Sequence, residues 1–262
     1  MPPRPDGLPI SRRRFGAIAA GVMSSVVFAE ACHPTADAET DQSRGSGRLS
    51  VRPKSGVKTT AQGTRALGLD AARDAILHVP ASVGSGPVPL LVLLHGAGGR
   101  GERQLQRQIA AIDATGVVVL APDSRDGTWD AIRGDYGPDV AFLNRALTRV
   151  FETVAVDPAR LAIGGFSDGA SYGLSLGLIN GDLFPKILAF SPGFVIQGTR
   201  QGKPRVFISH GTADEILPID RCSRRIVPAL KAYGYDVTYR EFEGGHQVPP
   251  AIADEGLKWV AG

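Results

Sequence analysis

A strand, a sharp turn and the start of a helix are expected in residues 161–172, which read LAIGGFSDGASY. Three apolar residues precede the pentapeptide Gly165-Phe166-Ser167-Asp168-Gly169, and small residues follow it. The pattern G-x-S-x-G between a strand and a helix is typical of a nucleophile elbow, whose tight turn holds the serine in a strained conformation. Both glycines have to be small because the two backbones approach each other there. Ser167 is therefore the candidate nucleophile.

A serine hydroxyl is a poor nucleophile, so the chain should supply a base. His246 lies in a loop after the last expected strand, where the base falls in the chain order serine, acid, histidine. The other four histidines fit less well. His33 lies in a polar segment, His78 in an early strand where a packed side chain is expected, and neither His95 nor His210 follows a candidate acid. We expect His246 to be the base.

The acid should follow a strand between the nucleophile and the base. Asp214 does so, because it ends the stretch HGTAD after the apolar residues 206–209. Its expected role is to hold the imidazole tautomer and to stabilise the imidazolium. Asp220 is instead expected to be a helix N-cap, Asp236 a turn residue and Asp182 a loop residue after the elbow helix.

A second glycine-rich turn, His95–Gly99, follows the apolar run at residues 89–94. Such a turn directs backbone N–H groups toward a developing oxyanion, and the expected donors are the N–H groups of Ala97 and Asp168. A phosphate-binding loop is a poor alternative, because the turn matches neither G-x-G-x-x-G nor the P-loop with its lysine.

Taken together, these motifs resemble the α/β-hydrolase superfamily over about residues 48–262. Within it, the chain resembles the lid-less bacterial carboxylesterase/phospholipase group, which is related to polyhydroxybutyrate depolymerases and feruloyl esterases. The resemblance implies a serine esterase that hydrolyses carboxylic esters through a Ser-His-Asp triad and an acyl-enzyme, without a metal or organic cofactor. Many carboxylesterases have glutamine after the nucleophile, whereas this chain has Asp168, which leaves the substrate range open.

The fold expected for residues 48–262 is a single α/β-hydrolase domain with a mostly parallel sheet of about eight strands flanked by helices. No cap domain is expected, because the connection at residues 192–204 is short. Strands are expected at residues 49–53, 64–69, 75–79, 89–94, 117–121, 161–164, 187–190, 206–209 and 237–242. Helices are expected at residues 102–114, 140–154, 170–180, 220–233 and 248–260.

The N-terminus resembles a twin-arginine export signal. The residues Ser11-Arg12-Arg13-Arg14-Phe15 precede a mildly apolar stretch at 16–29 and the small-x-small site Ala29-Glu30-Ala31. Residues 1–31 are therefore expected to be a signal peptide and polar residues 32–47 a flexible linker, which places the protein in the periplasm or outside the cell. The alternative is a basic segment that leads into a buried helix.

Cys32 follows the expected cleavage site directly, which is where a lipoprotein carries its anchor. A lipid anchor at Cys32, an incidental cysteine and a Cys32–Cys222 disulfide all remain open. The sequence does not define an oligomeric state.

Composition excludes several other classes. The chain has 262 residues, of which 43% are hydrophobic and 21% charged, and no apolar run reaches the length of a membrane span. The net charge of +3 falls to +1 without residues 1–31, so no nucleic-acid partner is implied. Two cysteines are too few for a disulfide-rich scaffold or a Cys-based zinc site. The expected partner is a small-molecule ester.

Substrate class remains open at this level. A lysophospholipase or phospholipase, a feruloyl or polyester hydrolase, and a non-catalytic binding protein with a hydrolase fold are the alternatives. Five aromatic residues are expected to lie mostly in the core, although any of them could line the cleft: Trp129, Tyr136, Phe166, Tyr172 and Phe194. Without a lid, short soluble esters of about two to six acyl carbons are expected. The loop at 124–138 is long enough to contradict this by covering the site.

Overall fold

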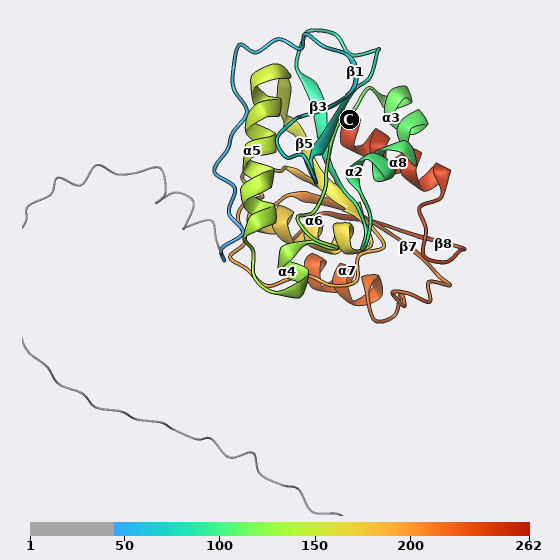
Figure 1. Ribbon diagram of the computed structural model, residues 1–262. Coiled ribbons are helices and arrows are strands. Elements are labelled where there is room, and N and C mark those ends of the chain that lie inside the picture. The colour runs from blue at the N-terminus through green and yellow to red at the C-terminus, as the bar shows by residue number, and fades with distance from the viewer. Residues whose placement is uncertain (1–44) are drawn as a thin grey trace, which may run out of the picture. The chain divides into compact units, whose positions relative to one another are not determined.

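The computed structural model describes residues 45–262, which form one eight-stranded sheet with helices on both faces (Figure 1). The strand order is β1-β2-β4-β3-β5-β6-β7-β8. The pairs β1–β2 and β2–β4 are antiparallel and all other neighbours are parallel. The strands are β1 (Gly63–Ala66), β2 (Ala75–Val79), β3 (Val88–Leu94), β4 (Val118–Pro122), β5 (Val156–Phe166), β6 (Lys186–Phe190), β7 (Arg205–Gly211) and β8 (Val237–Phe242). The prediction of a single, mostly parallel sheet of about eight strands is confirmed.

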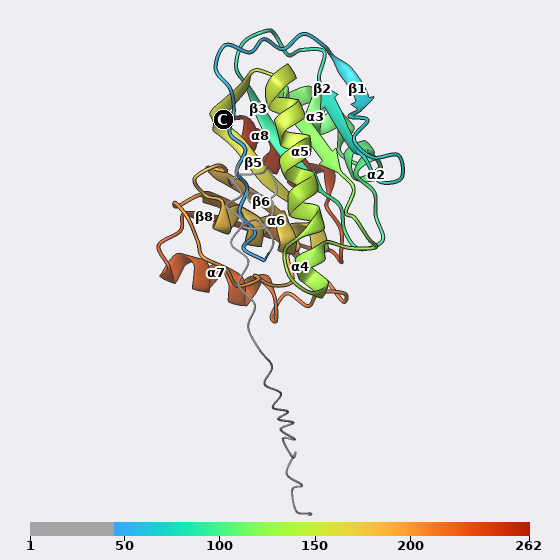
Figure 2. The same ribbon diagram turned by 60° about the vertical axis from the view of Figure 1, so that its left-hand side comes forward.

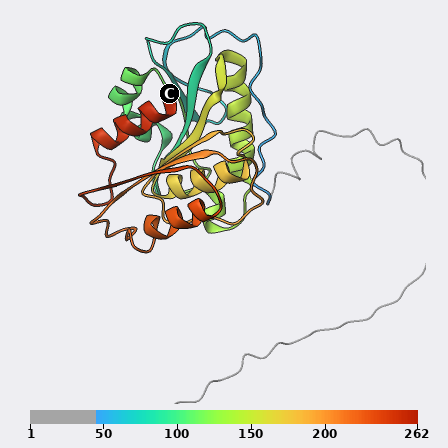
Figure 3. The same ribbon diagram turned by 180° about the vertical axis from the view of Figure 1, so that it is seen from behind.

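The helices form two layers, one on each face of the sheet (Figures 2 and 3). One layer contains α5 (Pro138–Thr153), α6 (Asp168–Ile179) and α7 (Ser223–Ala232), with the short α4 (Asp130–Arg133) beside α6. The other contains α2 (Gly101–Gln106), α3 (Ile109–Thr115) and α8 (Pro250–Ala261). The central strand β3 packs against both helix layers, because its side chains alternate between the two faces of the sheet. Leu90 and Val92 belong to one apolar core, and Leu91 and Leu93 belong to the other.

The first expected strand, at residues 49–53, is not a strand. Its N–H groups are bound by helix side chains instead: Leu49 donates to Asn180 Oδ1 at 2.8 Å, and Ser50 donates to Asn144 Oδ1 at 3.1 Å. The Asn180 amide also donates to the carbonyl of Gly47 at 2.8 Å. These contacts hold an extended segment along α5 and α6, away from the edge of the sheet.

Two expected helices also differ from the structure. The helix expected at 102–114 is divided into α2 and α3, because Gln108 leaves the helical conformation with φ −123° and ψ 5°. The helix expected from Asp220 begins at Ser223, and Asp220 is not its N-cap. The Asp220 carboxylate instead forms an ion pair with Arg224 at 2.9 Å.

The expected signal peptide and Cys32 lie outside the described residues, as does the expected linker except for its last three residues. The N–H of Gly45 donates to the carbonyl of Tyr136 at 2.7 Å, and Gly47 packs against the Tyr136 ring. Cys222 is buried. Between residues 45 and 262, none of the helices has the length and apolar character needed to cross a bilayer.

Candidate active site

Ser167 lies in the turn between β5 and α6, with φ 58° and ψ −122°. A positive φ is uncommon for a residue with a side chain and is retained only where the surroundings enforce it. The flanking glycines show why the turn is so tight. A Cβ on Gly165 would lie 2.3 Å from the carbonyl oxygen of Leu94, and a Cβ on Gly169 would lie 2.4 Å from the same atom. Neither position accommodates a side chain, as the sequence pattern implied.

The structure brings Ser167, His246 and Asp214 together from the ends of β5, β8 and β7. His246 Nε2 lies 2.8 Å from Ser167 Oγ, and His246 Nδ1 lies 2.7 Å from Asp214 Oδ2. A carboxylate only accepts hydrogen bonds, so Nδ1 carries the proton and the lone pair of Nε2 faces the serine hydroxyl. This geometry allows proton transfer from the hydroxyl to the imidazole.

Asp214 is buried, and its position is fixed by further hydrogen bonds. Its Oδ1 accepts the backbone N–H groups of Ile216 and Leu217 at 3.0 and 2.8 Å. Its Oδ2 also lies 3.2 Å from Nε2 of His210, a fully buried side chain on β7. The carboxylate is thus oriented from two sides.

His210 has a role that the sequence did not suggest. Its Nε2 lies 2.7 Å from the carbonyl of Leu217, so Nε2 carries a proton and can also donate to Asp214. Its Nδ1 then accepts the hydroxyl of Ser223 at 2.7 Å. Burial lowers the pKa of His210, which favours the neutral ring. His210 therefore supports the Asp214 carboxylate without competing for the Ser167 proton.

The predicted oxyanion donors lie beside Ser167. Ala97 lines the same cavity as Ser167, and within the described chain its N–H has no hydrogen-bond acceptor. The neighbouring N–H groups are occupied, since Gly98 donates to Gly127 and Gly99 donates to Gly96. Asp168 is the first residue of α6, where helix geometry leaves the N–H without an intrahelical partner. Two N–H groups are thus available next to Ser167.

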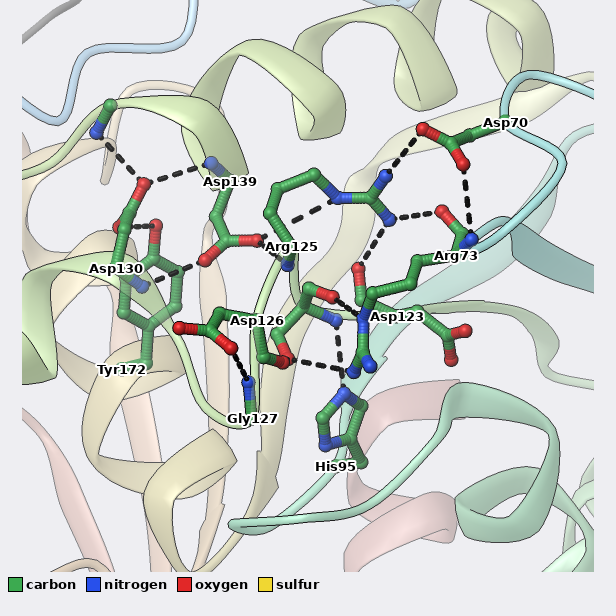
Figure 4. Close-up of polar contacts among 12 residues, drawn as sticks. Asp70, Arg73, His95, Asp123, Arg125, Asp126, Gly127, Asp130, Asp139 and Tyr172 are labelled. Carbon is green, nitrogen blue, oxygen red and sulfur yellow. Dashed lines mark hydrogen bonds and ion pairs between the residues drawn. The ribbon is translucent and has the colours of Figure 1, made fainter.

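The glycine-rich turn is held in place by hydrogen bonds from residues 124–139, which we call the bracing loop (Figure 4). The N–H of Ser124 donates to His95 Nε2 at 3.0 Å, and His95 Nδ1 donates to the carbonyl of Gly96 at 2.7 Å. The indole N–H of Trp129 donates to the carbonyl of His95 at 2.9 Å. Burial lowers the pKa of His95, so the neutral tautomer that makes both ring contacts is favoured.

The bracing loop is itself held by two carboxylates, the buried Asp139 and the half-buried Asp130 (Figure 4). Asp139 accepts the N–H groups of Arg125 and Asp130 at 2.6 and 2.7 Å. Asp130 accepts the N–H groups of Gly137 and Asp139 at 2.8 Å, and the Tyr172 hydroxyl at 2.9 Å. Burial and the neighbouring charge of Asp130 raise the pKa of Asp139 to about 6.

The packing of Trp129 and Tyr136 shows whether the loop at 124–138 covers the site. Trp129 and Tyr136 are buried and pack against Tyr172, which is also buried. The two aromatic side chains of the loop therefore lie in the core, and none of residues 124–138 lines the cavity at Ser167, so the loop forms no lid. Of the other aromatic residues considered, Phe166 lines the cavity that holds Ser167. Phe194 is exposed and does not line this cavity.

The Asp168 side chain is bound by the Thr128 hydroxyl, which donates to Oδ2 at 2.6 Å. Neither residue lines the cavity that holds Ser167. The Asp168 carboxylate is thus directed to the bracing loop, while its backbone N–H lies at the start of α6, next to Ser167.

A cavity of about 300 Å³ opens at Ser167, between the glycine-rich turn, α2 and the residues Phe166, Ile216 and His246. A second cavity of about 370 Å³ shares Phe166 and His246 and extends toward Val248. Within residues 45–262, no group of three or more His, Cys, Asp or Glu side chains is arranged to hold a metal ion.

Comparison with known proteins agrees with this architecture. The sequence pattern of the phospholipase/carboxylesterase family matches residues 143–255. The chain is 32% identical over 108 residues to acyl-protein thioesterase 1 of Gibberella zeae, which covers 37% of this chain and 46% of that protein. It spans less than half the length of the curated relatives it matches.

Solved structures extend the likeness to the whole fold. Esterase PE8 is 22% identical, with a TM-score of 0.58, over 70% of this chain and 95% of that one. The Bacillus cereus carboxylesterase is also 22% identical, with a TM-score of 0.57, over 73% and 94% of the two chains. The described chain thus has the α/β-hydrolase fold, and the predicted fold is confirmed. Over its second half, it is similar to the phospholipase/carboxylesterase family.

Proposed function

We propose that this protein is a serine esterase that hydrolyses carboxylic esters through Ser167, His246 and Asp214. The observation that carries the proposal is the hydrogen-bonded chain from Asp214 through His246 to Ser167 Oγ, beside two available N–H donors. The similarity to carboxylesterases supports the same reaction class.

In the proposed reaction, Ser167 Oγ attacks the ester carbonyl while His246 Nε2 takes its proton. The N–H groups of Ala97 and Asp168 stabilise the resulting oxyanion. The imidazolium then protonates the departing alcohol, and an acyl-enzyme remains on Ser167. Water, deprotonated by His246, attacks the acyl-enzyme, releases the carboxylic acid and restores the serine.

Replacement of the nucleophile tests the proposal. We expect Ser167→Ala to lose more than 99.9% of kcat on 4-nitrophenyl butyrate and all labelling by a fluorophosphonate probe, with an unchanged melting temperature. Ser85→Ala, at an exposed serine far from the elbow in sequence, is the control and should keep both. A variant that retains a tenth of kcat, or a wild type that is never labelled, contradicts the proposal. The second outcome would favour a non-catalytic binding protein.

We further propose that the substrates are short, soluble esters of about two to six acyl carbons. The large aromatic side chains of the bracing loop are buried, and none of its residues lines either cavity, so it adds no apolar wall at Ser167. A panel of 4-nitrophenyl esters of increasing chain length, with lysophospholipid, feruloyl and polyester substrates, separates this class from the alternatives. Faster hydrolysis of long-chain emulsions than of soluble butyrate esters would contradict it.

Export by the twin-arginine route is also a proposal, supported by the motif at residues 11–15 and the site at 29–31. Replacement of Arg12 and Arg13 by lysine should leave precursor in the cytoplasm, as measured by cell fractionation. Normal yields of mature protein outside the membrane would contradict it. Metabolic labelling with a fatty acid, in wild type and Cys32→Ser, tests the open question of a lipid anchor.

A further inference from the structure

One wall of the cavity at Ser167 is strongly basic. Arg100, Arg103 and Arg107 all line it, and their spacing of three and four residues places them on the same side of α2. Of the described residues that line this cavity and its neighbour, none is an aspartate or glutamate. Ser167 therefore shares its cavity with three arginines and with no carboxylate among the residues that line it.

Two of these cations have no partner among the described residues. Arg100 forms an ion pair with Asp123 at 2.8 Å and donates to the carbonyl of Ala72 at 2.9 Å. The exposed guanidinium groups of Arg103 and Arg107 form no hydrogen bond or ion pair with any of residues 45–262. Arg103 and Arg107 thus remain available to an anion that enters the cavity.

Two buried amide side chains lie on the same wall. Gln104, which is 3% exposed, lines both cavities, and Gln108, which is 5% exposed, lines the second. The Gln108 Oε1 atom is buried and has no hydrogen-bond partner in the described chain. The two amides make this wall polar where it meets the cavities. A wall of this kind suits a polar occupant better than an alkyl chain.

We propose that the esters hydrolysed at Ser167 carry an anionic group, which the guanidinium groups of Arg103 and Arg107 bind. The inference rests on the proposed esterase function and narrows its substrate class. Planar guanidinium groups bind carboxylates through paired N–H donors, and sulfonates and phosphates with similar geometry. Arg107 lines both cavities, so the anion belongs either to the acyl part or to the alcohol part of the ester.

Matched pairs of esters test this proposal and separate the two positions of the charge. The acyl pair is mono-4-nitrophenyl succinate against 4-nitrophenyl butyrate. The alcohol pair is 4-carboxyphenyl butyrate against its methyl ester. Each is measured with the wild type and with Arg103→Gln/Arg107→Gln. The control is Arg149→Gln/Lys231→Gln, which removes two exposed cations on α5 and α7 that lie outside both cavities.

We expect the Arg103→Gln/Arg107→Gln variant to lose about tenfold in kcat/KM on the anionic member of at least one pair, mainly through KM. Activity on the neutral esters should stay within about twofold, and the control variant should match the wild type. High salt should reduce the preference of the wild type for the anionic ester, because exposed charges are screened.

Two outcomes overturn the inference while leaving the proposed function intact. In one, the double variant has the same kcat/KM as the wild type on all four esters. In the other, anionic and neutral esters lose activity equally. If the wild type hydrolyses none of the esters, and Ser167→Ala is indistinguishable from it, the proposed function itself fails.

Discussion

The two walls that face Ser167 are held in opposite ways. The glycine-rich turn at 95–99 is fixed by hydrogen bonds of its backbone and of the His95 ring to the bracing loop. The α2 wall instead presents Arg103 and Arg107, whose side chains are exposed and unpaired within the described chain. Donors to an oxyanion require a fixed position, because their benefit depends on geometry at the reacting carbonyl. Recognition of a charged group tolerates longer, more mobile side chains.

Removal of the central side chain of the bracing loop should have the largest effect. Trp129→Ala deletes a fully buried indole that stacks on Tyr172 and holds the carbonyl of His95. We expect the free energy of unfolding to fall by about 3–5 kcal/mol and kcat to fall about 100-fold, because the turn loses its position. Chemical denaturation and kinetics at a temperature where the variant is folded measure the two effects.

Trp259→Ala is the matched control, because Trp259 is half-buried on α8 and contacts Phe207 on the far part of the sheet. It should lower stability but keep kcat within about twofold. Equal losses of kcat in the two variants would show that Trp129 affects the reaction no more than any other large side chain of the core.

The buried Asp139 should make the stability of the bracing loop depend on pH. Its pKa is raised to about 6, above the value of about 3.9 in an unfolded chain. The folded state therefore binds the proton more tightly, so this contribution is fully present below about pH 4 and is lost as the pH rises through about 6. Between about pH 4 and pH 7, we expect the free energy of unfolding of the wild type to fall by on the order of 2–3 kcal/mol relative to that of Asp139→Asn.

Denaturant unfolding at several pH values measures that difference. Asp135→Asn removes an exposed carboxylate from the same loop and should give a curve parallel to that of the wild type. A difference between wild type and Asp139→Asn that does not change from pH 4 to pH 7 would show that Asp139 does not titrate in this range.

A smaller effect is expected where the bracing loop meets the helix start. Thr128→Val removes the hydroxyl that binds the Asp168 carboxylate. We expect kcat to fall about three- to tenfold, because the released charge is free to approach the oxyanion, while water replaces part of the lost hydrogen bond. Thr128→Ser keeps the hydroxyl and should restore kcat. An unchanged kcat in Thr128→Val would show that the direction of the carboxylate has no effect on the reaction.

The smallest effect is expected at the exposed edge of the cavity. Ile216 is 69% exposed, and its hydrogen bond to Asp214 is donated by the backbone N–H. Ile216→Ser should therefore leave kcat unchanged and raise KM for the butyrate ester by about twofold or less, as steady-state kinetics would show. A tenfold loss of kcat would show that the side chain itself positions the acid.

The sequence predicted correctly those elements whose signal lies within a short stretch of chain. Continuous apolar runs predicted most strands, and a tight glycine-flanked turn predicted the elbow at Ser167. Chain order also led to Asp214 and His246, because side chains after parallel strands meet at one edge of the sheet. Their catalytic roles stay a prediction until the variants are measured.

The features that were missed depend on partners distant in sequence. Residues 49–53 resemble a strand, but the N–H groups of residues 49–51 are bound by Asn144 and Asn180, 93 or more residues away. His95 was set aside as a base, and its support of the glycine-rich turn depends on Ser124. The break after α2 has neither glycine nor proline at Arg107 and Gln108 to mark it.

The hydrogen bonds of Asn180 also set an order of events during synthesis. Leu49 and the side chain that binds its N–H are 131 residues apart. At 5–20 residues per second, the ribosome needs about 7 to 26 s to make that stretch of chain. The segment around Leu49 cannot dock until α6 is complete, so its attachment is a late step of folding. A protease that cleaves near residue 50 during synthesis would therefore report whether the chain has been made as far as Asn180, at the end of α6.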